Sequence, residues 1–445
     1  MLDAASKNKE GVYREASALR FNSPRPAMAE FIRGTAEYKA GAKSEYRAEA
    51  AYFAVLQQKT PEQASLAEKY LEREGSVIAR ELKAGSKLIF NGDTLSASVL
   101  ESYFGCPFAC FLQHGLRLAE RETGEVKRNE YGTLLHQTLE DYVRLIAADL
   151  GKDERRVRDK ATSDAVVMEI LAAVSSDYKY AKYLETDKFK AMFELVGKEA
   201  RRVAYAVFCQ LEGSSFKPVE TEAVFRDGAK YPALRINTPY GVKRINGKID
   251  RVDRYDDYVR IIDYKTGKTH EDDESFYTGN NIQLYLYMNA FLGKDDKPAG
   301  AYYFPVSDKY AEGDANVYGM KGKTLSSESV VVATDNSVHA TGGESSVLGA
   351  RFEFKNGNAT TRSKVLMNDG HFRAYLDYAL MISEKGATEI SDGVIAPSPY
   401  GSRCNTCRYF SVCGFDPSIG YERKEKGVNE QTVADAVEVQ NGLNK

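Results

Sequence analysis

One stretch in the middle of the chain decides the fold: residues 247–267 read GKIDRVDRYDDYVRIIDYKTG. Apolar and polar residues alternate on both sides of Asp256 and Asp257, which is the pattern of two strands joined by a tight turn. If the chain turns between these two residues, residues whose numbers sum to 513 pair across the hairpin, and Asp250 faces Asp263. The stretch therefore predicts a β-hairpin that brings two carboxylates together.

A cation would stabilise these two neighbouring carboxylates. Asp263 and Lys265 are two residues apart on one strand, so their side chains leave the same face of the sheet. Neighbouring carboxylates repel each other, and oxygen ligands with room for water and phosphate suit Mg²⁺ or Mn²⁺. A lysine beside such a metal can offset the charge that develops on a phosphate under attack. The alternative for this motif taken alone is a solvent-facing hairpin with alternating salt bridges.

The charge around the hairpin differs from that of the whole chain. The 445 residues include 61 Lys and Arg against 64 Asp and Glu, a formal net charge of −3. Residues 241–270 instead hold eight basic residues against five Asp. A phosphate backbone would be attracted to this local positive surplus.

His136 is a further candidate ligand. It lies in an expected helix over YGTLLHQTLEDYVRLIAADL, at the edge of an apolar face formed by Leu135, Leu139, Tyr142 and Ile146. A lone helical histidine is usually a packed or surface residue. Near two carboxylates, however, a neutral imidazole could complete a metal shell.

The composition is that of a globular protein. The chain is 43% hydrophobic, which excludes a wholly disordered chain and a collagen-like or coiled-coil rod. No run approaches the roughly 18 to 20 apolar residues that a membrane helix needs, and the N-terminus lacks a basic start followed by an apolar stretch. We therefore expect a soluble cytoplasmic protein without a membrane partner.

The six cysteines are unevenly placed. Cys404, Cys407 and Cys413 form C-x2-C-x5-C, and Cys106 and Cys110 lie about 300 residues earlier. Three thiolates leave a tetrahedral site one ligand short, and zinc and iron–sulfur clusters both commonly take four Cys. The early pair can supply the fourth ligand. The alternative is that all are reduced core cysteines, as we expect for Cys209 in the apolar run VAYAVFC. We favour a metal or cluster at the triplet.

Hydrophobic periodicity divides the chain. Residues 1–90 are charged with helical spacing, and after about residue 212 the period changes from helical to that of strands. Residues from about 306 to 364 are rich in Gly, Ser, Asp and Asn, with strand-like pieces such as SVVVAT and ARFEFKNG. We expect a helical segment at 1–90, an α/β domain at 91–425 with a loop-rich insertion at about 306–364, and a polar tail at 426–445.

Four motifs, in this order, resemble those of RecB-like nucleases of the PD-(D/E)XK superfamily. They are G-x-L-x-H from Gly132, G-x-I-D-R-x-D from Gly247, D-Y-K-T-G from Asp263 and Q-x-x-x-Y from Gln283. More narrowly, S-x-S-x-L-E-x-Y-x-x-C-P-F from Ser96 and the late cysteine triplet are similar to the C-terminal nuclease domain of AddB proteins, which belong to ATP-dependent helicase/deoxyribonucleases. The resemblance covers about residues 95–420.

The resemblance implies a fold and two sites. The fold is a restriction-endonuclease-like α/β core, a mixed central sheet flanked by helices, closed by an iron–sulfur staple. The implied nuclease site comprises the ligands of Mg²⁺ (or Mn²⁺) His136, Asp250 and Asp263, the catalytic Lys265, and Gln283 and Tyr287 in the DNA cleft. The implied ligands of a 4Fe-4S cluster are Cys106, Cys404, Cys407 and Cys413.

The activity that the resemblance implies is that of a metal-dependent DNA exonuclease. It would act on DNA ends or single strands in double-strand break processing and recombinational repair, with an AddA-like helicase-nuclease subunit as partner. Residues 1–90 would be the remnant of a helicase-like region. The alternatives are a non-catalytic DNA-binding iron–sulfur scaffold subunit and, more weakly, a zinc-stapled regulatory protein. The intact metal motif favours the enzyme.

Overall fold

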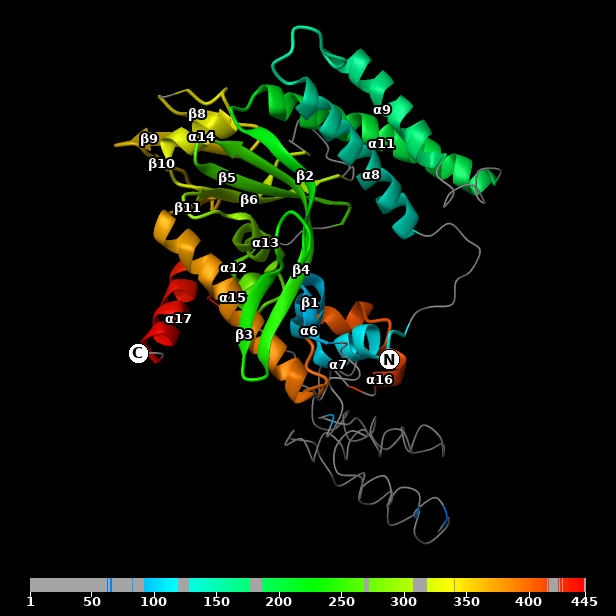
Figure 1. Ribbon diagram of the computed structural model, residues 1–445, viewed down its shortest axis with the longest axis vertical. Helices are drawn as coiled ribbons and strands as arrows, with labels where there is room; N and C mark the ends of the chain where they lie inside the picture. Colours follow the sequence, from blue (N-terminus) through cyan, green and yellow to red (C-terminus); the bar gives the residue numbers. More distant parts are fainter. Residues whose placement is uncertain are drawn as a thin grey trace, which may run out of the picture. The chain divides into compact units, whose positions relative to one another are not determined.

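The computed structural model describes most of the chain after residue 91 (Figure 1). The described ranges are 92–118, 128–176, 186–267, 272–306, 318–339, 341–413 and 427–443, with the single residues 62, 65, 82, 415, 423 and 425. The chain divides into a sheet unit (Lys83–Gly105, Cys110–Val394 and Glu425–Lys445) and a cysteine unit (Met1–Leu82, Cys106–Ala109 and Ile395–Lys424). The expected helical segment at 1–90 lies outside the described residues, apart from three single positions.

The sheet unit is built around a mixed β-sheet. Its described residues form eight strands in the order β1-β4-β5-β6-β7-β11, with β2 and β3 both paired to β4. Strand β5 is antiparallel to β4 and parallel to β6. The sheet is therefore mixed, as predicted for an α/β core with a mixed central sheet. The bounds are Thr94–Ser96 (β1), Lys217–Phe225 (β2), Leu234–Thr238 (β3), Gly241–Tyr255 (β4), Tyr258–Lys265 (β5), Lys297–Pro305 (β6), Lys321–Leu325 (β7) and Leu366–Met367 (β11).

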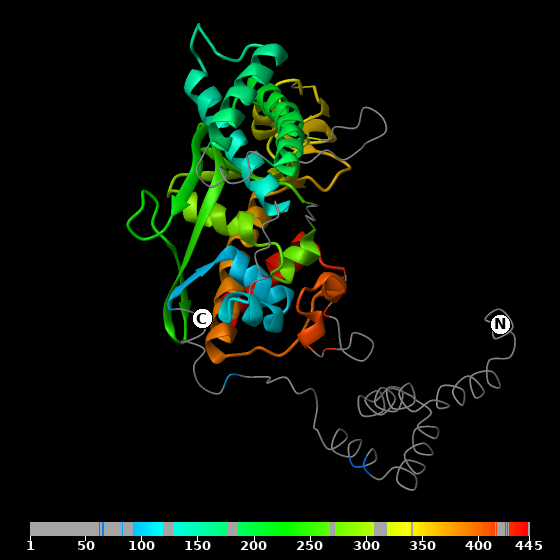
Figure 2. The same ribbon diagram turned by 90° about the vertical axis from the view of Figure 1, so that its right-hand side faces the viewer.

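Helices cover both faces of this sheet. Helices α8, α9 and α11 lie together on one side of the strands (Figures 1 and 2), and α6, α12, α13 and α15 contribute to the core on the other face. The predicted apolar face of α8 is confirmed, because Leu135, Leu139, Tyr142 and Ile146 are all buried. The bounds are Ala97–Gly105 (α6), Arg128–Asp149 (α8), Lys160–Ser175 (α9), Asp187–Glu212 (α11), Asp273–Tyr277 (α12), Gln283–Phe291 (α13) and Asp369–Asp392 (α15).

The hairpin of β4 and β5 has the predicted register. Its ladder runs from the turn to the pair Arg251 and Ile262, and the numbers of every pair sum to 513. Asp256, at the turn, has a φ of +50°, a left-handed conformation that Asp tolerates better than most residues. The ladder ends one position before Asp250 and Asp263, so their predicted facing stays a prediction, and Asp250 Oδ2 accepts a hydrogen bond from the backbone N–H of Tyr264.

The burial of β5 differs from the predicted alternation. All six residues from Val259 to Tyr264 are buried. Ile261 packs into the core that contains α6, α13 and α15, whereas Ile262 packs into the core that contains α8, α9 and α11. Because helices cover both faces of a central strand, apolar residues are needed on both faces and the alternation is lost.

The described part of 306–364 is more regular than the expected loop-rich insertion. Strand β7 joins the main sheet, and a second, three-stranded sheet consists of β8 (Gly343–Ser345), β9 (Ala350–Lys355) and β10 (Asn358–Thr360). The piece ARFEFKNG forms β9 as predicted, but SVVVAT belongs to the helix α14 (Glu328–Thr334). The strand prediction for SVVVAT was wrong because a short apolar run has no period that separates a strand from a buried helix.

The expected polar tail contains a packed helix, α17 (Glu430–Leu443). Its Val433 and Val437 are buried in the core that also contains α15. Glu430 Oε1 accepts a hydrogen bond of 2.7 Å from the buried Lys323 Nζ on β7. These contacts tie residues 430–443 to the sheet unit.

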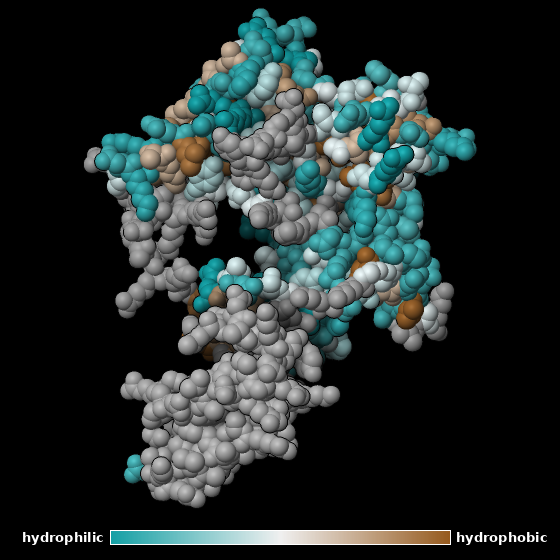
Figure 3. All heavy atoms as spheres, turned by 180° about the vertical axis from the view of Figure 1, so that it is seen from behind, coloured by the Kyte–Doolittle hydropathy of each residue, from teal (hydrophilic) through white to brown (hydrophobic). Residues whose placement is uncertain are grey.

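The surface is mainly polar on the side shown in Figure 3, where the hydrophobic atoms are scattered in separate places. None of the described helices has the length and apolar character needed to cross a membrane.

Candidate active site and cysteine pocket

The six residues predicted for the nuclease site come from helix α8, the β4–β5 hairpin and helix α13 of the sheet unit. His136 lies on α8, Asp250 on β4, Asp263 and Lys265 on β5, and Gln283 and Tyr287 on α13. Contacts link these side chains into two groups, one around Asp250 and one around Asp263.

Asp250 is held between α8 and β5. Its Oδ2 accepts a hydrogen bond of 2.8 Å from the backbone N–H of Tyr264 and lies 3.9 Å from His136 Nδ1. The His136 ring meets the Tyr264 ring edge-on, with 6.5 Å between centroids. The backbone of β5 therefore orients the carboxylate, and the ring of Tyr264 lines the position of the imidazole.

Asp263 contacts Lys265 and the first residue of α13. Lys265 Nζ lies 2.6 Å from Asp263 Oδ2 and donates a 3.2 Å hydrogen bond to Gln283 Oε1. Gln283 Nε2 donates to Asp263 Oδ1 at 3.2 Å and to the Tyr287 hydroxyl at 3.0 Å. The spacing of four residues places Gln283 and Tyr287 on one side of the helix. The Gln283 amide thus holds the aspartate and the lysine at the same time.

Gly247 on β4 leaves room for Tyr287 of α13 to lie close to the strand. A Cβ at this position would lie 2.3 Å from the Phe225 ring and 2.8 Å from the Tyr287 ring. Any other residue at the start of the G-x-I-D-R-x-D motif would therefore displace Tyr287, which contacts Gln283.

The site is short of positive charge. Burial, and then the charge of Asp250, raise the pKa of Asp263 to about 6 despite the opposing effect of Lys265. Burial also raises the pKa of Asp250 and lowers that of His136, so the imidazole is held neutral with a free electron pair. Two carboxylates that resist ionisation beside a neutral imidazole form an environment that a cation would stabilise.

The chemistry of these donors fits Mg²⁺ or Mn²⁺, which prefer carboxylate oxygens and accept an imidazole. Within the described ranges, no three His, Cys, Asp or Glu side chains converge closely enough to hold a metal ion as they are placed. The fit therefore rests on the donor types and the shared location of the side chains.

An open cleft of about 690 Å³ lies beside Asp250. Its lining includes His136 and two acidic residues that the sequence did not single out, Glu140 and Glu222. Glu222 lies opposite Asp250 in the β2–β4 register and has a φ of +54°, a costly conformation for a residue other than glycine. No local sequence pattern marks it, whereas Glu140 is one helical turn from His136.

Acidic side chains lie beside the basic residues that make up the positive surplus of residues 241–270. All seven basic residues of this stretch that the structure describes form ion pairs: Lys243, Arg244, Lys248, Arg251, Arg254, Arg260 and Lys265. The eighth, Lys268, lies outside the described residues. The count over residues 241–270 does not include acidic partners from other parts of the chain, such as Asp93 and Asp296, and the attraction of a phosphate backbone stays a prediction.

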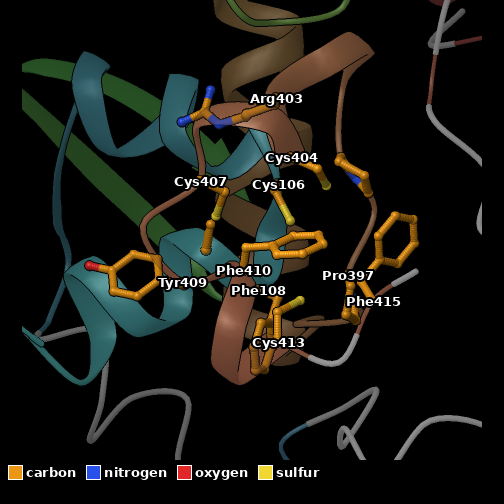
Figure 4. A pocket seen from close by; sticks show the side chains of 12 residues that line it. Cys106, Phe108, Pro397, Arg403, Cys404, Cys407, Tyr409, Phe410, Cys413 and Phe415 are labelled. Carbon is orange, nitrogen blue, oxygen red and sulfur yellow. The ribbon is translucent and has the colours of Figure 1, made fainter. Parts of the chain in front are cut away.

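The four cysteines implied by the resemblance line one pocket of the cysteine unit (Figure 4). Cys106 precedes the short helix α7 (Pro107–Cys110), Cys404 and Cys407 lie in and after a 3-10 turn, and Cys413 ends α16 (Phe410–Cys413). Aromatic side chains, including Phe108 and Phe410, complete the lining. Thiols in such a set fit zinc or an iron–sulfur cluster by donor type.

The other two cysteines do not line this pocket. Cys110 Sγ lies 3.6 Å from the carbonyl oxygen of Val99 in the sheet unit, so Cys106 is the member of the early pair that joins the triplet. Cys209, expected to be a core residue, is exposed. This expectation was wrong because Cys209 lies on the outer face of α11, whereas its neighbours Phe208 and Gln210 are buried.

Comparisons with known proteins agree with the fold and the motifs. Residues 94–414 match the model of the PD-(D/E)XK nuclease superfamily. Similar proteins, each named as the B component of an ATP-dependent helicase/deoxyribonuclease, occur in Exiguobacterium sibiricum, with 29% identity over 75% of this chain and 32% of the relative, and in Clostridium tetani, with 27% identity over 75% and 30%. The chain thus spans about a third of the length of the curated relatives that it matches. It belongs to the PD-(D/E)XK nuclease superfamily.

Proposed function

We propose that this chain carries a metal-dependent exonuclease domain that hydrolyses phosphodiester bonds of DNA. The observation that supports this most is the hairpin of β4 and β5, whose register runs toward Asp250 and Asp263 and on which Lys265 Nζ lies 2.6 Å from Asp263 Oδ2. The chemistry follows from family membership, and DNA as substrate follows from the names of the relatives.

The side chains have distinct roles in this proposal. Asp250, Asp263 and His136 would hold Mg²⁺ or Mn²⁺, which, when bound, lowers the pKa of a water and neutralises phosphate charge. Lys265 would stabilise the negative charge that builds up on the phosphate. Gln283 keeps the lysine in place through its Oε1, while Tyr287 holds the Gln283 amide from the other side.

We also propose that Cys106, Cys404, Cys407 and Cys413 hold a 4Fe-4S cluster, with zinc as the competing ligand. Their shared pocket supports either metal. Protein isolated without oxygen should be brown, with about four iron and four sulfide per chain. Cys413→Ala should lose the iron and Cys110→Ala, the matched control, should keep it. A colourless protein with one zinc per chain would favour the zinc alternative instead.

The biological setting is proposed from the relatives. Their name describes one component of an ATP-dependent helicase/deoxyribonuclease, so we propose a helicase-nuclease partner that resembles AddA. The complex would process DNA ends during double-strand break repair in the cytoplasm.

A degradation assay tests the activity. Protein purified without oxygen is incubated with end-labelled duplex and single-stranded DNA, with Mg²⁺, with Mn²⁺ or with EDTA, alone and with a helicase-nuclease partner protein. We expect loss of the DNA in the metal samples only. Binding of DNA without degradation under every condition would favour the scaffold alternative.

A further inference from the structure

Glu101 connects helix α6 to the start of helix α13. Its Oε1 accepts hydrogen bonds of 2.9 Å from the backbone N–H groups of both Ile282 and Gln283. Glu101 lies 181 residues before Ile282 in the sequence. A carboxylate from a distant helix therefore satisfies the first N–H groups of α13.

Four other helices of the sheet unit obtain this contact locally. The first N–H groups of a helix have no partner inside it and usually bind the side chain of the residue at the N-cap. Asp159, Thr186, Asp272 and Asn368 supply such bonds to α9, α11, α12 and α15. The N-cap of α13 is Ile282, which has no side chain able to do so. Glu101 replaces the missing local cap.

The capped end of α13 carries the contacts of the candidate active site. Gln283, whose N–H binds Glu101, uses its side chain to hold both Asp263 and Lys265. Small shifts of the helix start would move this amide directly. We infer that Glu101 is a positioning residue, which orients Gln283 and thereby Lys265 by capping α13 from another helix. This inference rests on the proposed nuclease function.

The location of Glu101 is unfavourable for a carboxylate that serves only packing. Burial raises its pKa to about 7, although the N–H of Gln283 and the charge of Lys265 lower it. An amide oxygen could accept the same two hydrogen bonds without that cost. Glu101→Gln therefore separates the hydrogen bonds from the charge.

The experiment compares three substitutions with the wild-type chain. Glu101→Gln keeps an acceptor, Glu101→Leu removes it at similar size, and Glu101→Ala serves as a second acceptor-free variant should the leucine not fold. Asp272→Ala is the matched control, since it removes a local cap from the neighbouring helix α12. Each protein is assessed by circular dichroism, by hydrogen–deuterium exchange of peptides covering residues 280–290, and by steady-state kinetics with Mg²⁺.

We expect the acceptor-free variants to exchange the first amides of α13 about fivefold faster, because one cap is lost. Their kcat should fall about 10- to 100-fold with little change in KM, since misplaced catalytic groups affect the rate. Glu101→Gln should stay near wild type in both measurements. Asp272→Ala should leave the exchange of α13 and kcat unchanged.

The exchange measurement needs neither metal, cluster nor cleavage. It therefore distinguishes a failure of the proposed cap from a failure of the proposed nuclease function. Wild-type protein without Mg²⁺-dependent cleavage would overturn the proposed function while the exchange still tests the cap. Unchanged exchange in the acceptor-free variants would overturn the cap itself. A Glu101→Gln enzyme as slow as Glu101→Leu would show that the charge, not positioning, is what matters.

Discussion

The β4–β5 hairpin carries two groups of charged side chains that differ in how their charges are balanced. One is the candidate site around Asp250, Asp263 and Lys265. The other comprises Arg251, Asp253 and Arg260, none of which has exposed surface. Successive residues of a strand leave opposite faces of a sheet, so neighbouring positions of one hairpin enter different surroundings.

In the arginine group, two guanidinium groups share one carboxylate. Asp253 accepts from Arg251 Nε at 2.7 Å and from Arg260 Nε at 2.9 Å, and Arg251 also donates to Gln210 Oε1 at 3.0 Å. Although burial opposes it, the two guanidinium groups lower the pKa of Asp253. In the candidate site, by contrast, the pKa values of both aspartates are raised. The arginine group surrounds one carboxylate with two cations, whereas the candidate site has two carboxylates and one lysine, an arrangement that a bound cation would stabilise.

The largest effect should come from breaking the arginine group. Asp253→Ala leaves two buried guanidinium groups without their carboxylate, which typically costs about 3 to 5 kcal/mol. We expect a fall of this size in the free energy of unfolding, measured by urea denaturation of the intact chain. If Asp253→Ala were as stable as wild type, the two groups would not differ in the way described.

A smaller effect, on rate and not on the fold, should follow from Asp263→Ala or Lys265→Ala. Removing one group that stabilises the transition state typically slows a reaction about 10² to 10³-fold. DNA degradation should fall by this factor while the circular dichroism spectrum and iron content stay unchanged. Asp257→Ala, at the exposed turn of the same hairpin, is the matched control and should retain full activity. Full activity in both site variants would refute the catalytic assignment.

The smallest effect is a pH-dependent gain in stability. The folded state raises the pKa of Asp263 from 3.8 to about 6, so ionising this residue opposes folding. The resulting cost is absent below about pH 4, grows as the pH rises to about 6, and is then constant. In EDTA, Asp263→Asn should therefore be more stable than wild type at pH 7 to 8, by on the order of 2 kcal/mol.

Urea denaturation of both proteins at pH 4 and pH 8 would measure this difference. Adding Mg²⁺ at pH 8 should stabilise the wild type more than Asp263→Asn, because the ion would bind the ionised carboxylate. An advantage of the variant that stays the same at pH 4 would show that Asp263 is not desolvated in the folded chain.

Local patterns predicted the parts of this fold that depend on neighbouring residues. The turn at Asp256 set the register of the hairpin, and the spacing of Leu135 and Leu139 set the buried face of α8. The facing of Asp250 and Asp263 is an extension of that register by one position and stays a prediction. These features need only the period of a strand or a helix.

Sequence patterns did not predict the features that depend on contacts between distant residues. Asp253 and Asp263 look alike in the motif, and only the arginines packed around Asp253 distinguish them. Glu101 stood within a motif that was noticed for its cysteine, but its contact lies 181 residues away. The helix at SVVVAT was missed because its packing partners, and not its period, select the conformation.

The order of the pocket cysteines along the chain has a consequence for biosynthesis. Cys106 leaves the ribosome before residues 110–394 of the sheet unit, and the other three follow them. At about 5 to 20 residues per second, roughly 15 to 60 seconds separate the first thiol from the last. Throughout that interval Cys106 has no partner from the triplet. Any group that all four thiols held would therefore be loaded late, and a ribosome that stalls between residues 394 and 404 yields a chain with the strands of the sheet unit, without α17 and with an incomplete pocket.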